Sequence, residues 1–493
     1  MATPDSDPCW ATIAEAQAAM QEGRLTAARL TQRFLERVEA YDRNGLRLNA
    51  VLEVNPEARV TAEALDRERA AGSTRGPLHG IPIFLKDNIA TADRLHTSAG
   101  SLALADCITP RDAFLVARLR EAGAVILGKA NMTEWANFMT TDMPAGYSSR
   151  GGQVKNPYGD ALSPGGSSSG SAVVVAAGLC TAAVGTETSG SILSPANWNS
   201  IVGVKPTLGL ISRSGVVPIA ASQDTAGPFG RTVADAAILL GAMTGVDAAD
   251  RATRASRRHA RRDYSELLTS AGLAGVRLGI PRAVFYERLA PAEAPVIETA
   301  LRALGGLGAV LVDPANIATA REVIDFRSDV MLYEFKRDLN RYLRGLGAAS
   351  PVHSIRELIR FNEARPQEML RYGQIRLLAA QSTNGLRTAT YRRSRAEDLR
   401  ISRADGIDRV MKGERLDALV FPGWSGAAIG AKAGYPSVIV PAGYTVDGTP
   451  IGLTFLGRAW SEPTLLRVAH TFESATRYRR PPPSVAQGAK ESS

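Results

Sequence analysis

Residues 162–198 read LSPGGSSSGSAVVVAAGLCTAAVGTETSGSILSPANW, two serine- and glycine-rich clusters on either side of an apolar stretch. The first cluster spans residues 167–171, and the second contains Ser189 and Ser191. Glycine and serine are costly to order because they lose much conformational freedom on folding. A flexible linker is one interpretation of such a segment, and an ordered active site is the other. The rest of the sequence favours the active site.

Size and composition are those of a globular protein with a substantial core. The chain has 493 residues, of which 45% are hydrophobic and 22% are charged, and length alone is compatible with two or three domains. The N-terminal residues lack the basic and apolar regions of a secretory signal. The longest apolar run, residues 172–185, is shorter than the ~20 residues of a membrane-spanning helix. We therefore expect no membrane partner and a cytoplasmic location.

Cysteine usage agrees with that location. Cys9, Cys107 and Cys180 are far apart and form no CxxC motif, so we expect buried thiols in a reducing compartment rather than disulfides or a zinc site.

A net charge of +9 raises the question of a nucleic-acid partner. The densest basic segment, residues 251–262, reads RATRASRRHARR. It has no interleaved aromatic residues and matches no helix-turn-helix, zinc-finger or RNA-recognition pattern. We expect a solvated surface segment and no nucleic-acid partner. A non-catalytic basic scaffold or nucleic-acid binder stays as the alternative of another class.

Helical and strand-like periodicities alternate along the chain, which predicts an α/β fold with helices covering a sheet. We expect one domain over residues 1–480, a helical cap around residues 320–412 and a disordered tail over residues 481–493. The main expected helices are at 10–41 with a break near Gly23, 56–71, 131–136, 232–245 and 462–478. The main expected strands are at 81–86, 124–129, 276–282, 416–423, 436–444 and 451–460.

Two partial motifs do not carry a function. GAVILGK at residues 123–129 resembles a phosphate-binding loop, but Ala130 stands where a metal-binding hydroxyl is needed. GSSSG at residues 166–170 fits a nucleophile elbow centred on Ser168, which requires an acid and a histidine later in the chain. The histidines that follow, at positions 259, 353 and 470, have no catalytic setting. We expect no histidine-based triad, no metal and no cofactor.

Lysine can replace histidine as the base when burial keeps it neutral. Lys86 ends the apolar run IPIFL, where a side chain can enter a cleft at the end of a strand. By itself this position is equally compatible with a surface lysine.

Three segments in this order resemble the amidase signature family of serine hydrolases: GIPIFLKDNIAT (80–91), SPGGSSSGSAVVVAAGL (163–179) and VGTETSGSILSPANWNSIVGVKPT (184–207). Further segments, such as KANMTEWANF (129–138), SSRGGQVKNPYG (148–159) and SQDTAGP (222–228), are most similar to bacterial peptide amidases. The resemblance implies a large mixed, twisted central β-sheet with helices on both faces.

The resemblance also implies a Ser–cis-Ser–Lys triad. Its lysine corresponds to Lys86, its first serine to Ser167 and its nucleophile to Ser191. Ser191 would attack the amide carbonyl, and Ser167 would relay the proton to neutral Lys86. The cis peptide bond would join Gly166 to Ser167, where small residues relieve crowding.

The residues before the nucleophile are expected to form the oxyanion hole. Backbone N–H groups of Thr188, Ser189, Gly190 and Ser191 would converge on the developing negative charge. Ser168 is expected to hydrogen-bond the lysine. Ser169 and Ser171 are expected to cap the helix that starts there.

This chain departs from the common family pattern GTDTGGSIR at Glu187, Ser189 and Leu193, which affects how the loop is braced and which substrates fit. We expect a carboxamide substrate, including peptide C-terminal amides, anilides, or related esters and carbamates. The alternative enzyme is the glutaminase subunit of a tRNA-dependent amidotransferase. The residues expected to line the pocket are 138–150, Tyr333, Phe335 and 421–435.

Overall fold

The apolar runs of the sequence form strands that are buried on both faces. Every residue of β2 and of β6 is buried, and strands covered on both faces carry such near-continuous apolar sequence. The computed structural model describes residues 7–269 and 271–485. Its strands are β1 (Val51–Val54), β2 (Pro82–Lys86), β3 (Val125–Ala130), β4 (Tyr147–Ser148), β5 (Gly152–Gln153), β6 (Ala182–Glu187), β7 (Val202–Lys205), β8 (Thr225–Gly230), β9 (Arg277–Gly279), β10 (Val310–Val312), β11 (Ala418–Pro422), β12 (Ser437–Tyr444) and β13 (Pro450–Leu456).

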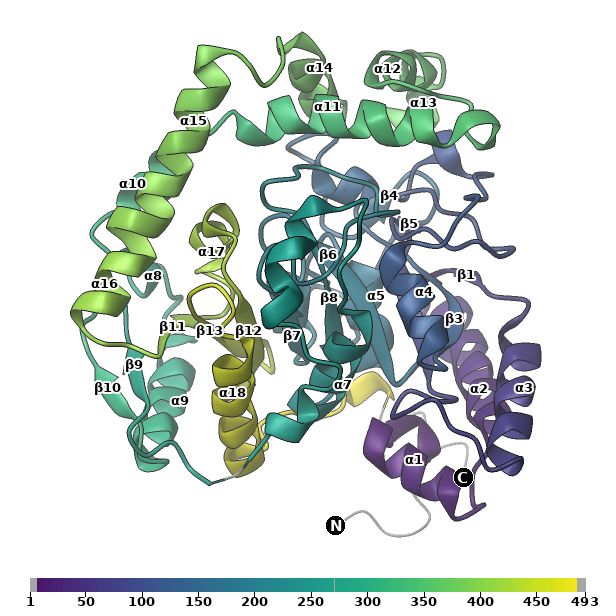
Figure 1. Cartoon of the computed structure of the whole chain (residues 1–493), viewed down its shortest axis with the longest axis horizontal. Coiled ribbons are helices and arrows are strands. Elements are labelled where there is room, and N and C mark those ends of the chain that lie inside the picture. Colours follow the sequence, from purple (N-terminus) through teal and green to yellow (C-terminus); the bar gives the residue numbers. More distant parts are fainter. Residues whose placement is uncertain (1–6, 270, 486–493) are drawn as a thin grey trace.

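Eleven of these strands form one mixed sheet in the order β1-β3-β2-β6-β8-β7-β12-β13-β11-β9-β10 (Figure 1). Strand β2 pairs in parallel with β3 and β6, and β6 pairs antiparallel with β8. The register places Leu85 opposite Val184, so the ends of β2 and β6 meet at one edge of the sheet. The expected α/β fold with a large mixed sheet is confirmed.

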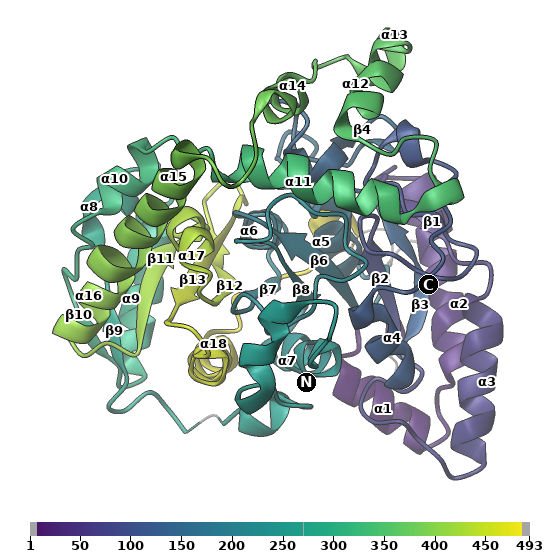
Figure 2. The same ribbon diagram turned by 45° about the horizontal axis from the view of Figure 1, so that its top comes forward.

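Helices surround the sheet. Figure 2 shows α5 and α6 on one side of the central strands and α7 and α18 on the other. The helices are α1 (Ile13–Gln21), α2 (Ala27–Arg37), α3 (Ala58–Ala70), α4 (Phe114–Glu121), α5 (Ser169–Ala176), α6 (Leu193–Trp198), α7 (Val233–Met243), α8 (Arg282–Phe285), α9 (Ala294–Gly306), α10 (Ala320–Asp325), α11 (Val330–Gly345), α12 (Ile355–Glu363), α13 (Pro366–Met369), α14 (Ile375–Ser382), α15 (Ala389–Leu399), α16 (Asp408–Gly413), α17 (Ala427–Ala433) and α18 (Glu462–Thr476).

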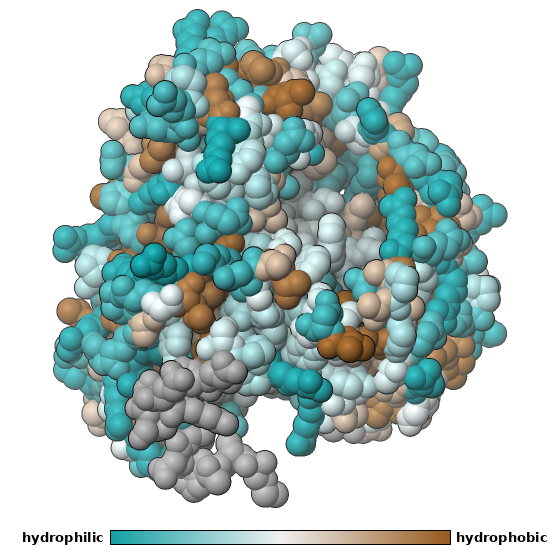
Figure 3. Space-filling view, turned by 180° about the vertical axis from the view of Figure 1, so that it is seen from behind, coloured by the Kyte–Doolittle hydropathy of each residue, from teal (hydrophilic) through white to brown (hydrophobic). Residues whose placement is uncertain are grey.

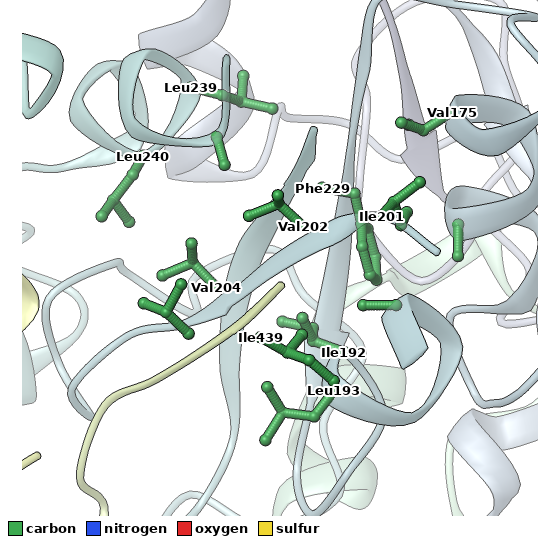
Figure 4. Close-up of a cluster of buried hydrophobic side chains, with 14 of the residues drawn as sticks. Val175, Ile192, Leu193, Ile201, Val202, Val204, Phe229, Leu239, Leu240 and Ile439 are labelled. Atoms are coloured by element: carbon green, nitrogen blue, oxygen red, sulfur yellow. The ribbon is translucent and has the colours of Figure 1, made fainter. Parts of the chain in front are cut away.

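The main core lies between the sheet and these helices. Figure 4 shows Ile192 and Leu193, at the start of α6, gathered with Ile439 of β12 and with Val202 of β7. Leu193 is completely buried, and burying such a side chain contributes about 1.5–3 kcal/mol. At the position where the common family pattern has arginine, this chain therefore has a core residue.

A second apolar cluster joins α11, α12 and α14 to loops beside the sheet. Phe335 and Leu339 of α11 pack with Trp135, Phe138 and other residues of the loops. The rings of Phe138 and Phe335 meet edge to face with centroids 5.0 Å apart. In Figure 1 these helices lie along one side of the molecule, and the cluster fixes them above loops that border the candidate site.

Two sequence expectations about secondary structure are wrong. The predicted helix at 131–136 is only a short 3-10 turn, η4 (Glu134–Asn137), with Trp135 and Ala136 at positive φ. Tertiary contacts override helix propensity there, because the Trp135 N–H donates to Ala99 and Glu134 accepts from Ser149. The predicted disordered tail over residues 481–493 is wrong at its start, because Val485 is buried and Ser484 donates to Pro157; residues 486–493 lie outside the described residues.

The surface carries the excess positive charge. The arginines of the segment 251–262 are exposed on and after a 3-10 helix, η5 (Arg251–Arg258), as expected for a solvated segment. Figure 3 shows hydrophobic residues in small groups among hydrophilic ones on the face opposite to Figure 1. Among the described residues, no helix combines the length and apolar character that crossing a bilayer requires.

Candidate active site

Lys86 ends the central strand β2 and points into the interior of the protein. Its side chain is completely buried. Its Nζ lies 2.8 Å from Ser167 Oγ, 2.9 Å from Thr186 Oγ1 and 3.3 Å from the Thr186 carbonyl oxygen. The pairing of β2 with β6 brings Lys86 to Thr186, although 100 residues separate them.

An uncharged amine can make all of these contacts. A neutral amine has two N–H bonds and one lone pair, and Thr186 offers two acceptor atoms to the N–H bonds. The lone pair is then left facing the Ser167 hydroxyl. Thr186 was not predicted as a site residue, because its role depends on the pairing of two strands that are distant in the sequence.

Burial lowers the pKa of Lys86 from 10.5 to about 7, and the negative charges of Glu187 and Asp224 oppose part of this shift. An ammonium group loses its hydration in such a site, whereas the neutral amine loses much less. The Lys86 amine is therefore half deprotonated near neutral pH, which is the range a general base needs.

Ser167 sits in a tight bend before α5. The peptide bond between Gly166 and Ser167 is cis. A Cβ atom at Gly165, where φ is +67°, would lie 2.5 Å from Pro195 Cα, and one at Gly166 would lie 2.8 Å from Thr133 Oγ1. Only glycine fits at these two positions, as the sequence indicated.

The neighbouring serines bind backbone carbonyl groups. Ser168 Oγ donates to the Thr186 carbonyl oxygen at 3.0 Å and accepts from the Thr186 N–H at 3.2 Å, so the expected bond from Ser168 to Lys86 is wrong. Ser169 Oγ donates to Gly165 and Ser171 Oγ donates to Val184. The last two therefore have structural roles but do not cap α5, because both lie within the helix and their hydroxyl groups donate to backbone carbonyl oxygens.

Ser191 lies in the loop between β6 and α6, next to the first serine cluster. The Ser168 N–H donates to the Ser191 carbonyl oxygen at 3.3 Å, which ties the two clusters together. Ser191 is 8% exposed, unlike completely buried Ser167, and it lines an open cavity. Of these two serines, Ser191 is therefore the one that borders the cavity.

The loop before Ser191 leaves its N–H groups free. Within the described residues, the N–H groups of Thr188, Ser189, Gly190 and Ser191 donate no hydrogen bond to the protein. Gly190 adopts a φ of +85°, a conformation that glycine reaches without strain. Free N–H groups in a row can bind a developing oxyanion.

Two buried carboxyl groups hold this loop. Glu187 Oε2 accepts from the N–H groups of Ile192 at 2.7 Å and Leu193 at 3.0 Å. Thr188 Oγ1 donates to Asp224 Oδ1 at 2.6 Å. Glu187 thus braces the loop without the arginine of the common pattern. The sequence gives no local signal of this contact, because Asp224 lies 36 residues after Thr188.

Asp224 also fixes the opposite wall of the site. Its Oδ2 accepts from the N–H groups of Ile219 and Ala220, each at 2.8 Å. Burial raises the pKa of Asp224 to about 7, so its charge varies in the same pH range as that of Lys86.

A cavity of about 550 Å³ opens in front of Ser191. Phe138 and Trp424 line it as predicted, but Tyr333 and Phe335 do not; Phe335 is buried behind Phe138. Trp198, Ile219, Met331 and Arg376 are among the lining residues outside the predicted set. The volume suits a small peptide or a compound of similar size.

The other chemical groups considered from the sequence have structural surroundings. Lys129, from the partial phosphate-binding motif, is buried at the end of β3 and donates to Thr97 Oγ1 at 2.8 Å. Cys9, Cys107 and Cys180 are buried free thiols. Over residues 7–269 and 271–485, no group of three or more His, Cys, Asp or Glu side chains is placed to hold a metal ion.

Comparisons with known proteins place the chain among enzymes that hydrolyse amides. Residues 29–466 match the family model described as Amidase. The chain therefore belongs to the amidase family. This result confirms the resemblance to the amidase signature enzymes.

Individual relatives match over nearly their whole length. A solved structure of a peptide amidase from Stenotrophomonas maltophilia is 47% identical, with a TM-score of 0.92 over 96% of this chain and 99% of that chain. A probable amidase from Arabidopsis thaliana is 42% identical over 97% of this chain and 92% of its own length. One subunit of the glutamyl-tRNA(Gln) amidotransferase from Halorhodospira halophila is 37% identical over 96% of this chain and 98% of its own length.

Proposed function

We propose that this protein hydrolyses carboxamides, in particular the C-terminal amides of peptides, through an acyl-enzyme on Ser191. The observation that carries the proposal is the contact of 2.8 Å between buried Lys86 Nζ and Ser167 Oγ, beside a loop of free N–H groups. The similarity to the peptide amidase from Stenotrophomonas maltophilia supports the choice of peptide amides.

In this mechanism, Ser191 Oγ attacks the carbonyl carbon of the amide. Its proton passes to Ser167, and the Ser167 proton passes to the lone pair of neutral Lys86. The tetrahedral intermediate then collapses, and the proton returns through Ser167 to the leaving nitrogen, which departs as ammonia. Water attacks the resulting ester by the same route in reverse and releases the acid product from Ser191.

The free N–H groups of residues 188–191 stabilise the oxyanion of each tetrahedral intermediate. Removal of one such donor in a hydrolase costs about 3 kcal/mol in the transition state. The carboxyl groups of Glu187 and Asp224 keep the donors in place through Ile192, Leu193 and Thr188. The loop is thus ordered before the substrate arrives.

Covalent labelling tests the assignment of the nucleophile. A phosphonofluoridate should modify Ser191, as located by mass spectrometry of peptides. Ser191→Ala should lose both labelling and amide hydrolysis while it keeps its circular dichroism spectrum. Ser194→Ala is the matched control, because Ser194 lines the same cavity but has no part in the mechanism. Labelling of another residue, or hydrolysis by Ser191→Ala, would contradict the proposal.

The alternative role as a glutaminase subunit predicts a different behaviour. The protein would then release ammonia from glutamine and depend on partner subunits. The proposal is supported if the purified chain alone hydrolyses peptide amides faster than glutamine.

We also propose that the enzyme is located in the cytoplasm. Its free buried thiols fit a reducing compartment.

A further inference from the structure

The cavity in front of Ser191 has one charged side chain in its lining. Among the described residues that border it, Arg376 is charged, and the others are apolar or neutral, including Phe138, Met331 and Trp424. No carboxylate borders this cavity in the described part of the chain. Its wall is therefore positive on balance.

Arg376 is held at the cavity by an aromatic ring. It is the second residue of α14 and is half-buried. Its guanidinium carbon lies 5.0 Å from the centroid of the Phe138 ring, close enough for a cation–π contact that limits its orientations. Phe138 is itself fixed by Phe335, so the position of the charge depends on the packed cluster under α11.

The guanidinium of Arg376 has no anionic partner in residues 7–269 and 271–485, and it donates no hydrogen bond there. Two other half-buried arginines pair with carboxylates: Arg150 with Glu53 at 3.0 Å, and Arg337 with Asp338 at 2.6 Å. Burial lowers the pKa of Arg376, yet a guanidinium stays protonated in proteins. An oriented cation with unused donors is suited to binding an acidic group of a ligand.

We propose that Arg376 binds a carboxylate of the substrate, so that the enzyme prefers peptide amides with an aspartyl or glutamyl side chain near the scissile amide. The inference rests on the proposed function and specifies its substrate class. A charge-assisted hydrogen bond contributes about 1.5–3 kcal/mol, which corresponds to a preference of roughly 10- to 150-fold in kcat/KM.

Matched peptide amides test this preference. Ammonia release is measured for peptide amides that carry glutamate, glutamine or lysine at the amide-bearing residue or at the residue before it. Wild-type enzyme should prefer glutamate over glutamine by at least tenfold at one of these positions, mainly through a lower KM. Arg376→Met should remove this gap, so that the glutamate and glutamine peptides are hydrolysed with similar kcat/KM.

The control variant is Arg371→Met. Arg371 is an exposed arginine that stands over the ring of Tyr372 and does not line the cavity, so its loss should leave the preference intact. Arg376→Lys keeps the charge and should retain part of the preference, which separates a loss of recognition from a loss of folding.

Equal rates with glutamate and glutamine peptides in wild-type enzyme would overturn the inference but not the proposed function. A uniform loss with all peptides in Arg376→Met would also overturn it. Absence of ammonia release from every peptide amide would instead refute the proposed function.

Discussion

Replacement of Lys86 by methionine separates the two consequences of burying an amine, one for stability and one for activity. Methionine is of similar length and apolar, so it fills the space of the lysine stem without a titratable group. Burial lowers the pKa of Lys86 from 10.5 to about 7. At 1.36 kcal/mol per pKa unit, this shift corresponds to about 5 kcal/mol between the charged and neutral forms in the fold.

The sign of the effect on stability follows from proton binding. Between pH 7 and 10.5 the unfolded chain holds a proton on Lys86 that the folded chain has released, so the free energy of unfolding rises with pH. The slope is about 1.4 kcal/mol per pH unit, and it vanishes below pH 7, where both states are protonated. The unfolding free energy of wild type minus that of Lys86→Met should therefore become more positive by about 2.5 kcal/mol from pH 7.5 to 9.5.

Activity should follow the same titration. The neutral fraction of an amine with a pKa of about 7 rises roughly tenfold between pH 6 and pH 8, and kcat/KM should rise with it. Lys86→Met should lose activity by about two to four orders of magnitude. Urea unfolding at several pH values and ammonia release from a peptide amide measure the two effects.

The control is Lys129→Met. Burial lowers the pKa of Lys129 to about 8, but this amine binds Thr97 and lies outside the candidate site. Its loss should change the pH dependence of stability and leave the acid limb of the rate profile in place. A difference between wild type and Lys86→Met that does not vary with pH would show that Lys86 is charged in the fold, and the reasoning would fail.

Three further substitutions test the framework of the site. Thr188→Val removes the bond of 2.6 Å to Asp224; it should lower kcat by roughly tenfold, because oxyanion donors are sensitive to position, with KM nearly unchanged in steady-state kinetics. Gly165→Ala places a Cβ atom 2.5 Å from the backbone of α6 at a φ of +67°, which should cost about 2–4 kcal/mol in urea unfolding. Glu187→Gln keeps an acceptor for the backbone N–H groups but removes a negative charge that raises the pKa of Lys86. The acid limb of the pH profile of kcat/KM should therefore move to lower pH. An unchanged limb would exclude this electrostatic coupling.

The sequence predicted those parts of the molecule that depend on local pattern. Apolar runs such as IPIFL became buried strands, and the break near Gly23 separates α1 from α2. The prediction of a helix at 131–136 was wrong because hydrogen bonds to the distant residues Ala99 and Ser149 set the conformation of this segment. Local propensity is decisive only where tertiary contacts do not compete.

The residues of the candidate site also fall into those with a local sequence signal and those placed by tertiary contacts. The motifs identified Lys86, Ser167 and Ser191, and the structure brings Lys86 to Ser167. Thr186 and Asp224 carry no local signal, because each acts through a residue that only the folded sheet or a crossing loop brings near. Arg376 could not be predicted either, since a cavity wall is built from segments that are far apart in the chain.

The parallel pairing of β2 with β6 has a consequence for how the enzyme matures. The Lys86 amine and the serine hydroxyl groups come from separate regions of the polypeptide. They are brought together when the central strands β2 and β6 pair. In a partly folded chain in which β2 and β6 are not paired, these lysine and serine side chains are solvated and have ordinary reactivity. Regain of turnover after dilution from denaturant therefore reports the pairing of β2 with β6, a long-range contact that costs loop-closure entropy.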